Sequence, residues 1–145
     1  MTDARLHFSA VARQMLLHDS AGEVTSAACA VSTARALELL QERLAPLVGT
    51  AGMRALFARA VKVTHLEFAE LAPVRAAMVD EKVHAAETLT EALDGLDSAS
   101  AWAAATALFT NFLELTSSLI GERLVFVILQ RAFPNIDVVA KQESE

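Results

Sequence analysis

Cysteine is almost absent from this sequence, because Cys29 is the only one among 145 residues. A single cysteine excludes an internal disulfide and a thiolate zinc cluster, so neither feature points to a secreted protein. Alanines and a valine surround Cys29 in the sequence, and such an apolar setting tends to raise the pKa of a thiol. We therefore interpret Cys29 as a small core residue and not as a nucleophile.

Strand formers are scarce as well. The chain has no tyrosine, few runs of β-branched residues, and no strict alternation of apolar and polar residues between turn pairs. Five glycines and three prolines punctuate it, without a repeat or a low-complexity linker. We expect one all-α domain over residues 1–134, a bundle of about six helices, followed by a frayed, polar and acidic tail over residues 135–145.

Basic charge is in deficit, since 12 lysines and arginines face 18 acidic residues and leave a net charge of −6. A protein that binds a nucleic-acid duplex usually presents a strong basic face. We therefore expect no nucleic-acid partner, and attraction to an anionic membrane surface is disfavoured for the same reason. The first residues lack an apolar core of signal-peptide length, so the cytoplasm is the expected location.

Sequence motifs of catalysis are missing too. The chain has no P-loop, no dinucleotide fingerprint and no nucleophile elbow. Glu81 and His84 form one E-x-x-H pattern, whereas carboxylate-bridged di-iron bundles use two such patterns and two further glutamates. We interpret this pair as surface residues, and we expect a protein that is not an enzyme and has no metal and no cofactor.

Apolar residues are abundant at 54% of the chain, and they recur at helical spacing almost throughout. Between the helices, we expect a broken stretch from His65 to Pro73 that buries Leu66, Phe68 and Leu71. The spacing and the turn formers predict six helices. The first three cover residues 3–18, residue 25 or 26 to the Pro46–Gly49 region, and residues 50–64. The last three cover residues 73–93, with an interruption near Asp80, residue 98 or 100 to residue 120, and residues 124–132.

The segment 99–120 is the most apolar part, and Glu114 is its only charged residue. A helix of this kind is either the centre of a bundle or a membrane span. Asn111 and Glu114 near its middle argue against a span, because a carboxylate in hydrocarbon is unfavourable. We predict a buried central helix with Thr110, Glu114, Ser117 and Ser118 on a narrow polar side. For residues 124–129 a strand is the competing prediction, but the flanking pattern favours helix.

More apolar side chains are present than a single globule of this size is expected to hide, which suggests association. The chain is predicted to be a regulatory or signalling module that binds protein, and most simply a second copy of itself as a dimer. The flank of the second helix is one expected surface. The other lies in the last helix and consists of Leu124, Val125, Phe126, Ile128 and Leu129.

The sequence is also compatible with two other functions. One is a sensor with a cavity for a small apolar ligand, lined by Trp102, Phe109 and Phe112, with Glu114 or His65 as the polar anchor. The other is phosphotransfer at His65, since the size and helicity resemble those of histidine phosphotransfer domains. The lysine and glycine that commonly follow such a histidine are missing here, and the nearby Glu67 would repel phosphate.

Overall fold

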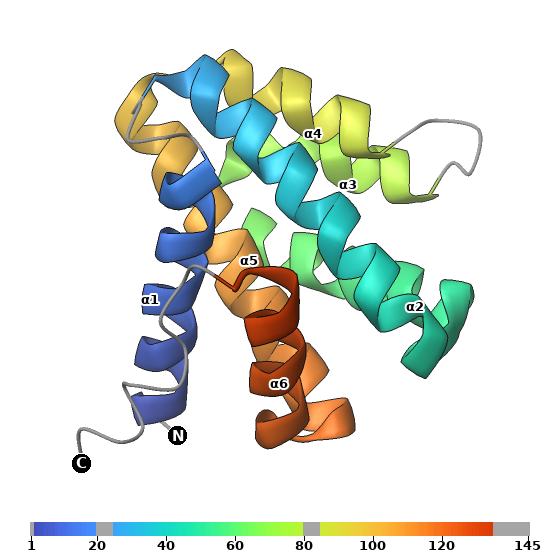
Figure 1. Ribbon diagram of the computed structural model, residues 1–145. Helices are drawn as coiled ribbons and strands as arrows, with labels where there is room; N and C mark the ends of the chain where they lie inside the picture. Colours follow the sequence, from blue (N-terminus) through green and yellow to red (C-terminus); the bar gives the residue numbers. More distant parts are fainter. Residues whose placement is uncertain (1, 20–24, 80–84, 135–145) are drawn as a thin grey trace.

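The computed structural model describes residues 2–19, 25–79 and 85–134, and within these ranges it contains helices and no strand (Figure 1). The all-α prediction is confirmed, and residues 124–132 are helical. The acidic tail over 135–145 lies outside the described residues. The elements are α1 (Thr2–Asp19), α2 (Ser26–His65), the 3-10 turn η1 (Ala69–Leu71), α3 (Ala72–Val79), α4 (Ala85–Asp94), α5 (Ser98–Ile120) and α6 (Glu122–Ala132).

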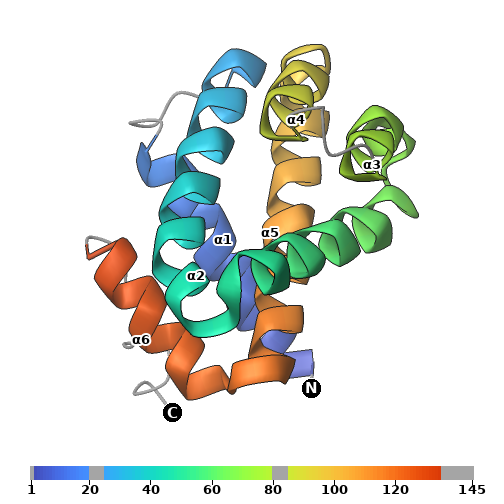
Figure 2. The same cartoon turned by 90° about the vertical axis from the view of Figure 1, so that its right-hand side faces the viewer.

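Helix α2 contains a sharp corner at Gly49, where the backbone has φ 80° and ψ 161°. Only glycine adopts this region readily, and Pro46 three residues earlier already weakens the helix. The corner divides α2 into a first arm, residues 26–48, and a second arm, residues 50–65, which run in different directions (Figure 2). The sequence predicted this break correctly. Thr25 caps the first arm by accepting a hydrogen bond from the Ala28 N–H at 3.1 Å.

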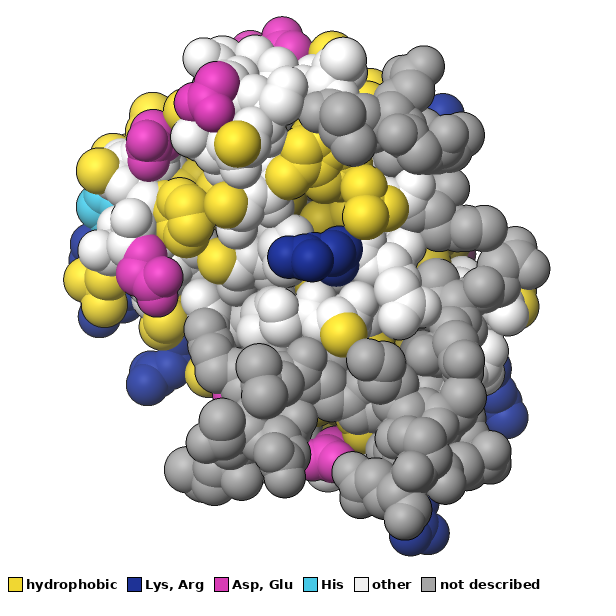
Figure 3. Space-filling view, turned by 90° about the vertical axis from the view of Figure 1, so that its left-hand side faces the viewer, with side chains coloured by type: hydrophobic (Ala, Val, Ile, Leu, Met, Phe, Trp, Pro, Cys, Tyr) yellow, Lys and Arg dark blue, Asp and Glu magenta, His cyan; other side chains and the backbone are white. Residues whose placement is uncertain are grey.

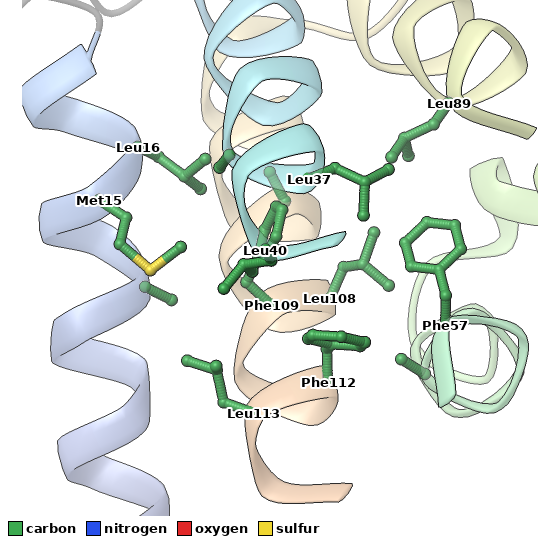
Figure 4. Close-up of a cluster of buried hydrophobic side chains, with 14 of the residues drawn as sticks. Met15, Leu16, Leu37, Leu40, Phe57, Leu89, Leu108, Phe109, Phe112 and Leu113 are labelled. Carbon is green, nitrogen blue, oxygen red and sulfur yellow. The ribbon is translucent and has the colours of Figure 1, made fainter. Parts of the chain in front are cut away.

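Helix α5 lies at the centre of the bundle, in contact with α1, α2, α4 and α6. Its side chains fill the space between Met15 of α1 and Phe57 of the second arm (Figure 4). The cap of α5 is Asp97, which accepts a hydrogen bond from the Ser100 N–H at 3.1 Å, and not Ser98 or Ser100 as predicted. The hydrogen bonds from Ser100 lower the pKa of the Asp97 carboxyl.

By length and composition alone, α5 could cross a membrane, since an 18-residue window in it has a mean hydropathy of 1.2. Half of that window is buried inside the structure, and the core helix of a bundle meets the same criterion. The four helices packed around α5 agree with the predicted role as a central helix.

The region between α2 and α5 is divided near Asp80, as the sequence predicted. The predicted helix over 73–93 is two helices, α3 and α4, and residues 80–84 between them, with the Glu81–His84 pair, lie outside the described residues. Leu71 is buried as expected, but Leu66 is 80% exposed. The prediction for Leu66 was wrong because this residue directly follows the last turn of α2, where the chain leaves the bundle before Leu71 returns to it.

Candidate functional site

Helix α6 begins at a second corner, Gly121, with φ 95° and ψ 146°. After this corner α6 folds back onto the bundle, where it contacts α5 and α2. The ring of Phe126 lies 5.3 Å from that of Phe8 in α1, measured between centroids. Four of the five residues predicted as an interaction surface are therefore buried in the chain's own core: Val125, Phe126, Ile128 and Leu129.

A smaller set of apolar side chains remains exposed around the same corner. Leu119 at the end of α5 is 61% exposed, and Leu124 and Val127 on α6 are 39% and 42% exposed. We call these three residues the corner patch. On the first arm of α2, Val31 and Leu47 are also about half exposed. Apolar side chains gather on the face shown in Figure 3 as well, with acidic side chains between them.

A hollow of about 560 Å³ opens between α1, the second arm of α2 and α5, close to the α5–α6 corner. Most of its lining comes from α5, because residues 111, 114, 115 and 118 fall on one face of a helix. We call it the α5 hollow. The residues that line it are Phe8, Val63, Asn111, Glu114, Leu115, Ser117, Ser118 and Glu122.

The inner wall of the hollow is fixed by a buried polar contact. Asn111 Nδ2 donates a hydrogen bond to Thr64 Oγ1 at 2.9 Å, and Thr64 Oγ1 donates in turn to the carbonyl oxygen of Ala60 at 2.7 Å. Both Asn111 and Thr64 are buried, so this chain of bonds satisfies polar groups that burial would otherwise penalise. It ties the second arm of α2 to the middle of α5. Sequence reasoning noticed Asn111 but not its partner.

The predicted pocket residues do not come together. Phe109 and Phe112 are fully buried in the core, and the Phe112 ring meets the Phe57 ring edge to face at 6.5 Å. Trp102 packs against the core at the start of α5. Of the five residues predicted to form a ligand pocket, Glu114 alone lines the α5 hollow.

The polar side of α5 is narrower than predicted. Glu114, Ser117 and Ser118 line the hollow, and the Ser118 hydroxyl donates to the Glu114 carbonyl oxygen at 3.2 Å. Thr110 is buried instead, and its hydroxyl donates to the Thr106 carbonyl oxygen at 2.7 Å. A threonine can be buried in this way because its hydroxyl finds a partner in the preceding turn.

His65 is the last residue of α2 and is partly buried. Its Nδ1 lies 3.4 Å from Nη1 of Arg75 in α3, while Glu67 and Glu70 nearby are exposed. His65 does not line the α5 hollow. The phosphotransfer hypothesis for this residue stays a prediction. The side chains of the other three histidines, His7, His18 and His84, lie outside the described residues.

Cys29 lies in the first turns of α2 and is fully buried. Burial raises the pKa of its thiol to about 11, and a hydrogen bond with Thr33, 3.9 Å from Sγ to Oγ1, partly opposes that rise. A thiol of this kind stays protonated near neutral pH, which supports its interpretation as a core residue.

Among the residues that the structure describes, His, Cys, Asp and Glu side chains do not gather in a group of three that could hold a metal ion. Comparison of the chain with protein-family models, curated proteins and solved structures found no match. The function of this chain therefore has to be inferred from the corner patch and the α5 hollow.

Proposed function

We propose that this chain is a non-enzymatic helical interaction module that associates with a second copy of itself through the corner patch. The observation that carries this proposal is the exposure of three large apolar side chains, Leu119, Leu124 and Val127, around one helix corner. Helix α6 presents Arg123 and Arg131 beside them, and a polar rim around an apolar centre is typical of protein interfaces.

The first arm of α2 offers further exposed apolar side chains. Helix α6 contacts α2, and Val31 and Leu47 on the first arm are exposed. Glu38 and Glu42 on the same arm are exposed as well, so the arginines of α6 have acidic groups of opposite sign available on a second copy. Exposed ion pairs contribute little to stability, so the apolar contact at the corner patch would provide most of the association.

The affinity should be modest. Full burial of a leucine or valine side chain favours association by about 1.5–3 kcal/mol, but association also loses translational and rotational freedom worth at least about 4 kcal/mol. The corner patch is small relative to a standard interface of about 1,600 Å². We therefore expect a weak dimer, with a dissociation constant of about 0.1–1 mM.

Sedimentation equilibrium at concentrations up to about 1 mM tests the proposal. The wild-type chain should pass from monomer to dimer as its concentration rises, and the double variant Leu124→Gln/Val127→Gln should stay monomeric. Leu66→Gln is the matched control, since it changes an even more exposed leucine outside the corner patch and should dimerise like the wild type. A wild-type chain that is monomeric throughout this range would refute the proposal.

A second candidate function is a sensor for a small ligand, and one observation favours it. Glu114, which the sequence suggested as a polar anchor, lines the α5 hollow together with the apolar side chains of Phe8, Val63 and Leu115. Ligand sites commonly occupy clefts of about 300–1,000 Å³ that combine apolar walls with a few polar groups. The volume of the α5 hollow, about 560 Å³, falls in that range.

A further inference from the structure

A single residue, Gly121, separates α5 from α6. Helical hydrogen bonds flank it on both sides, since its N–H donates to the Ser117 carbonyl oxygen at 2.8 Å and its carbonyl oxygen accepts from the Val125 N–H at 3.2 Å. Both bonds join residues four positions apart, as in an α-helix. The corner itself comes from the backbone of Gly121, with φ 95° and ψ 146°. Rotation at this one residue would join α5 and α6 into a continuous helix over residues 98–132.

The bent form of the corner depends on glycine. A Cβ added to Gly121 would meet no atom of the described residues within 4 Å. A side chain here would therefore be disfavoured by the backbone conformation and not by a clash, because L-residues other than glycine rarely adopt this region. The straight form has the opposite preference, since alanine is favoured over glycine inside a helix.

Helix α6 packs mainly on parts of the bundle that lie outside its connection to α5. It contacts α2, and its Phe126 ring lies beside the Phe8 ring of α1, as α6 folds back along the bundle (Figure 2). If α6 continued straight from α5, its buried apolar side chains and the surface that they cover would both be exposed. The α6 of a second copy has the same side chains and would cover the same surface. The buried side chains are Val125, Phe126, Ile128 and Leu129.

The corner at Gly121 is better suited to such an exchange than the corner at Gly49. Opening the chain at Gly49 would separate α1 and the first arm of α2 from the rest of the bundle. Helix α1 packs on α5, and α2 packs on both α4 and α5, so most of the core would come apart. Helix α6 is the last helix of the described residues. It can leave while α1, α2, α4 and α5 stay packed together.

Straightening would also align apolar side chains that the corner now separates. Ile120, Leu124 and Val127 follow one another at intervals of four and three residues, so in a continuous helix they lie on one face. Leu124 and Val127 belong to the corner patch and are exposed, and Ile120 is partly buried. In a pair of chains that exchange α6, the two continuous helices can pack along this stripe. The corner patch would then be covered by the same patch of the second copy.

We infer that Gly121 is a hinge at which two copies of this chain exchange α6, so that each α6 packs on the bundle of the other copy. The inference rests on the proposed self-association and specifies how the copies are joined. Most wild-type molecules stay closed at low concentration, because two chains lose translational and rotational freedom when they pair. An exchanged dimer separates slowly, since each α6 must first leave the core of the other copy.

Substitution at the hinge provides the first test. Gly121→Ala should disfavour the bent corner by about tenfold in each chain. Two corners open in each dimer, so the variant should dimerise about a hundredfold more tightly than the wild type in sedimentation equilibrium. Gly95→Ala is the matched control, because φ of Gly95 is not positive and an added Cβ would meet only ordinary contacts, the nearest at 3.6 Å. It should associate like the wild type.

The position of α6 is then measured directly by NMR. Equal amounts of isotope-labelled and unlabelled full-length chain are refolded together from urea at millimolar concentration. The rings of Phe8 and Phe126, whose centroids are 5.3 Å apart, should give a nuclear Overhauser effect between a labelled and an unlabelled chain. The exchanged dimer should also survive dilution to micromolar concentration during gel filtration. The wild type is treated in the same way, so the test does not depend on the folding of Gly121→Ala.

The outcomes separate the inference from the proposed function. If the wild type stays monomeric after refolding at millimolar concentration, both are wrong. If it dimerises without the effect between Phe8 and Phe126 of different chains, self-association stands and the exchange of α6 is wrong. An effect confined to Gly121→Ala would also overturn the inference, because the natural chain would then keep its own α6. If Gly121→Ala dimerises no more tightly than Gly95→Ala, Gly121 is not the hinge and the inference fails.

Discussion

The two faces of α5 differ in how tightly they are packed. One face presents Phe109 and Phe112 to a packed core, fully shielded from water. The other presents Glu114, Leu115 and Ser118 to a half-open hollow. One helix therefore packs against the core on one side and borders a partly polar hollow on the other, so substitutions on the two faces should differ in their effect on stability.

The largest effect should follow from opening the packed face. Phe112→Ala removes a ring that contacts the core and the Phe57 ring, and it should lower the free energy of unfolding by about 3–5 kcal/mol. Leu115→Ala on the hollow face should lower it by only about 1 kcal/mol, because Leu115 is partly exposed already. Urea unfolding measures both values, and similar losses at the two positions would contradict the comparison.

The packed region should also respond to alkaline pH through Cys29. Because burial raises the pKa of this thiol from 9.0 to about 11, the unfolded chain releases the proton first as the pH rises. The contribution of Cys29 to stability is therefore complete below about pH 9 and declines as the pH rises toward 11, by about 2 kcal/mol.

Urea unfolding measures the stability of the wild type and of Cys29→Ala at a series of pH values from neutral to alkaline. The difference between the two proteins isolates the contribution of the Cys29 thiol, because the lysines titrate in both. The difference in stability between the two proteins should shift in favour of Cys29→Ala as the pH rises. A difference that is constant with pH would show that the thiol is not buried from water in solution.

The hydrogen bond from Asn111 to Thr64 lies between the packed face of α5 and its hollow face. Asn111→Leu removes this bond and places an apolar group beside the Thr64 hydroxyl, and it should lower stability by about 1–3 kcal/mol. The double variant Asn111→Leu/Thr64→Val should lose less than the sum of the two single variants, since the two groups depend on each other. Strictly additive losses would show that the bond contributes nothing.

The smallest effect on stability belongs to the hollow face. Ser118→Ala, at an exposed position, should change the free energy of unfolding by less than about 0.5 kcal/mol, as is usual away from packed regions. Thermal unfolding of this variant checks the expectation. A large loss for Ser118→Ala would mean that this part of the hollow face serves the fold, and the contrast between the two faces would then disappear.

The sequence was sufficient to predict the helices and the central position of α5. Pro46 with Gly49 marked the corner in α2, and the length of the apolar segment after Asp97 marked α5 as the central helix. Both signals are local, because they depend on backbone preferences and on the periodicity of a single segment. The predicted cap of α5 was Ser98 or Ser100, whereas the observed cap is Asp97. The prediction missed it because serine and aspartate side chains can all serve as caps.

The candidate site was harder to predict because it depends on distant pairs. Asn111 and Thr64 are 47 positions apart, and no periodicity within either helix relates them. The apolar stripe of α6 was recognised, but periodicity cannot tell whether a stripe faces its own chain or a partner. The corner at Gly121 decides this, because it turns Val125 and Leu129 inward and leaves Leu124 exposed.

The position of α5 late in the sequence affects how the protein is made. The helices that precede it, α1, α2 and α4, share it as a packing partner, yet α5 starts only at Ser98. A ribosome adds about 5–20 residues per second. The apolar faces of the earlier helices therefore stay uncovered for several seconds, until α5 leaves the exit tunnel. During that interval chaperones, or another nascent chain, can reach surfaces that the finished molecule never exposes.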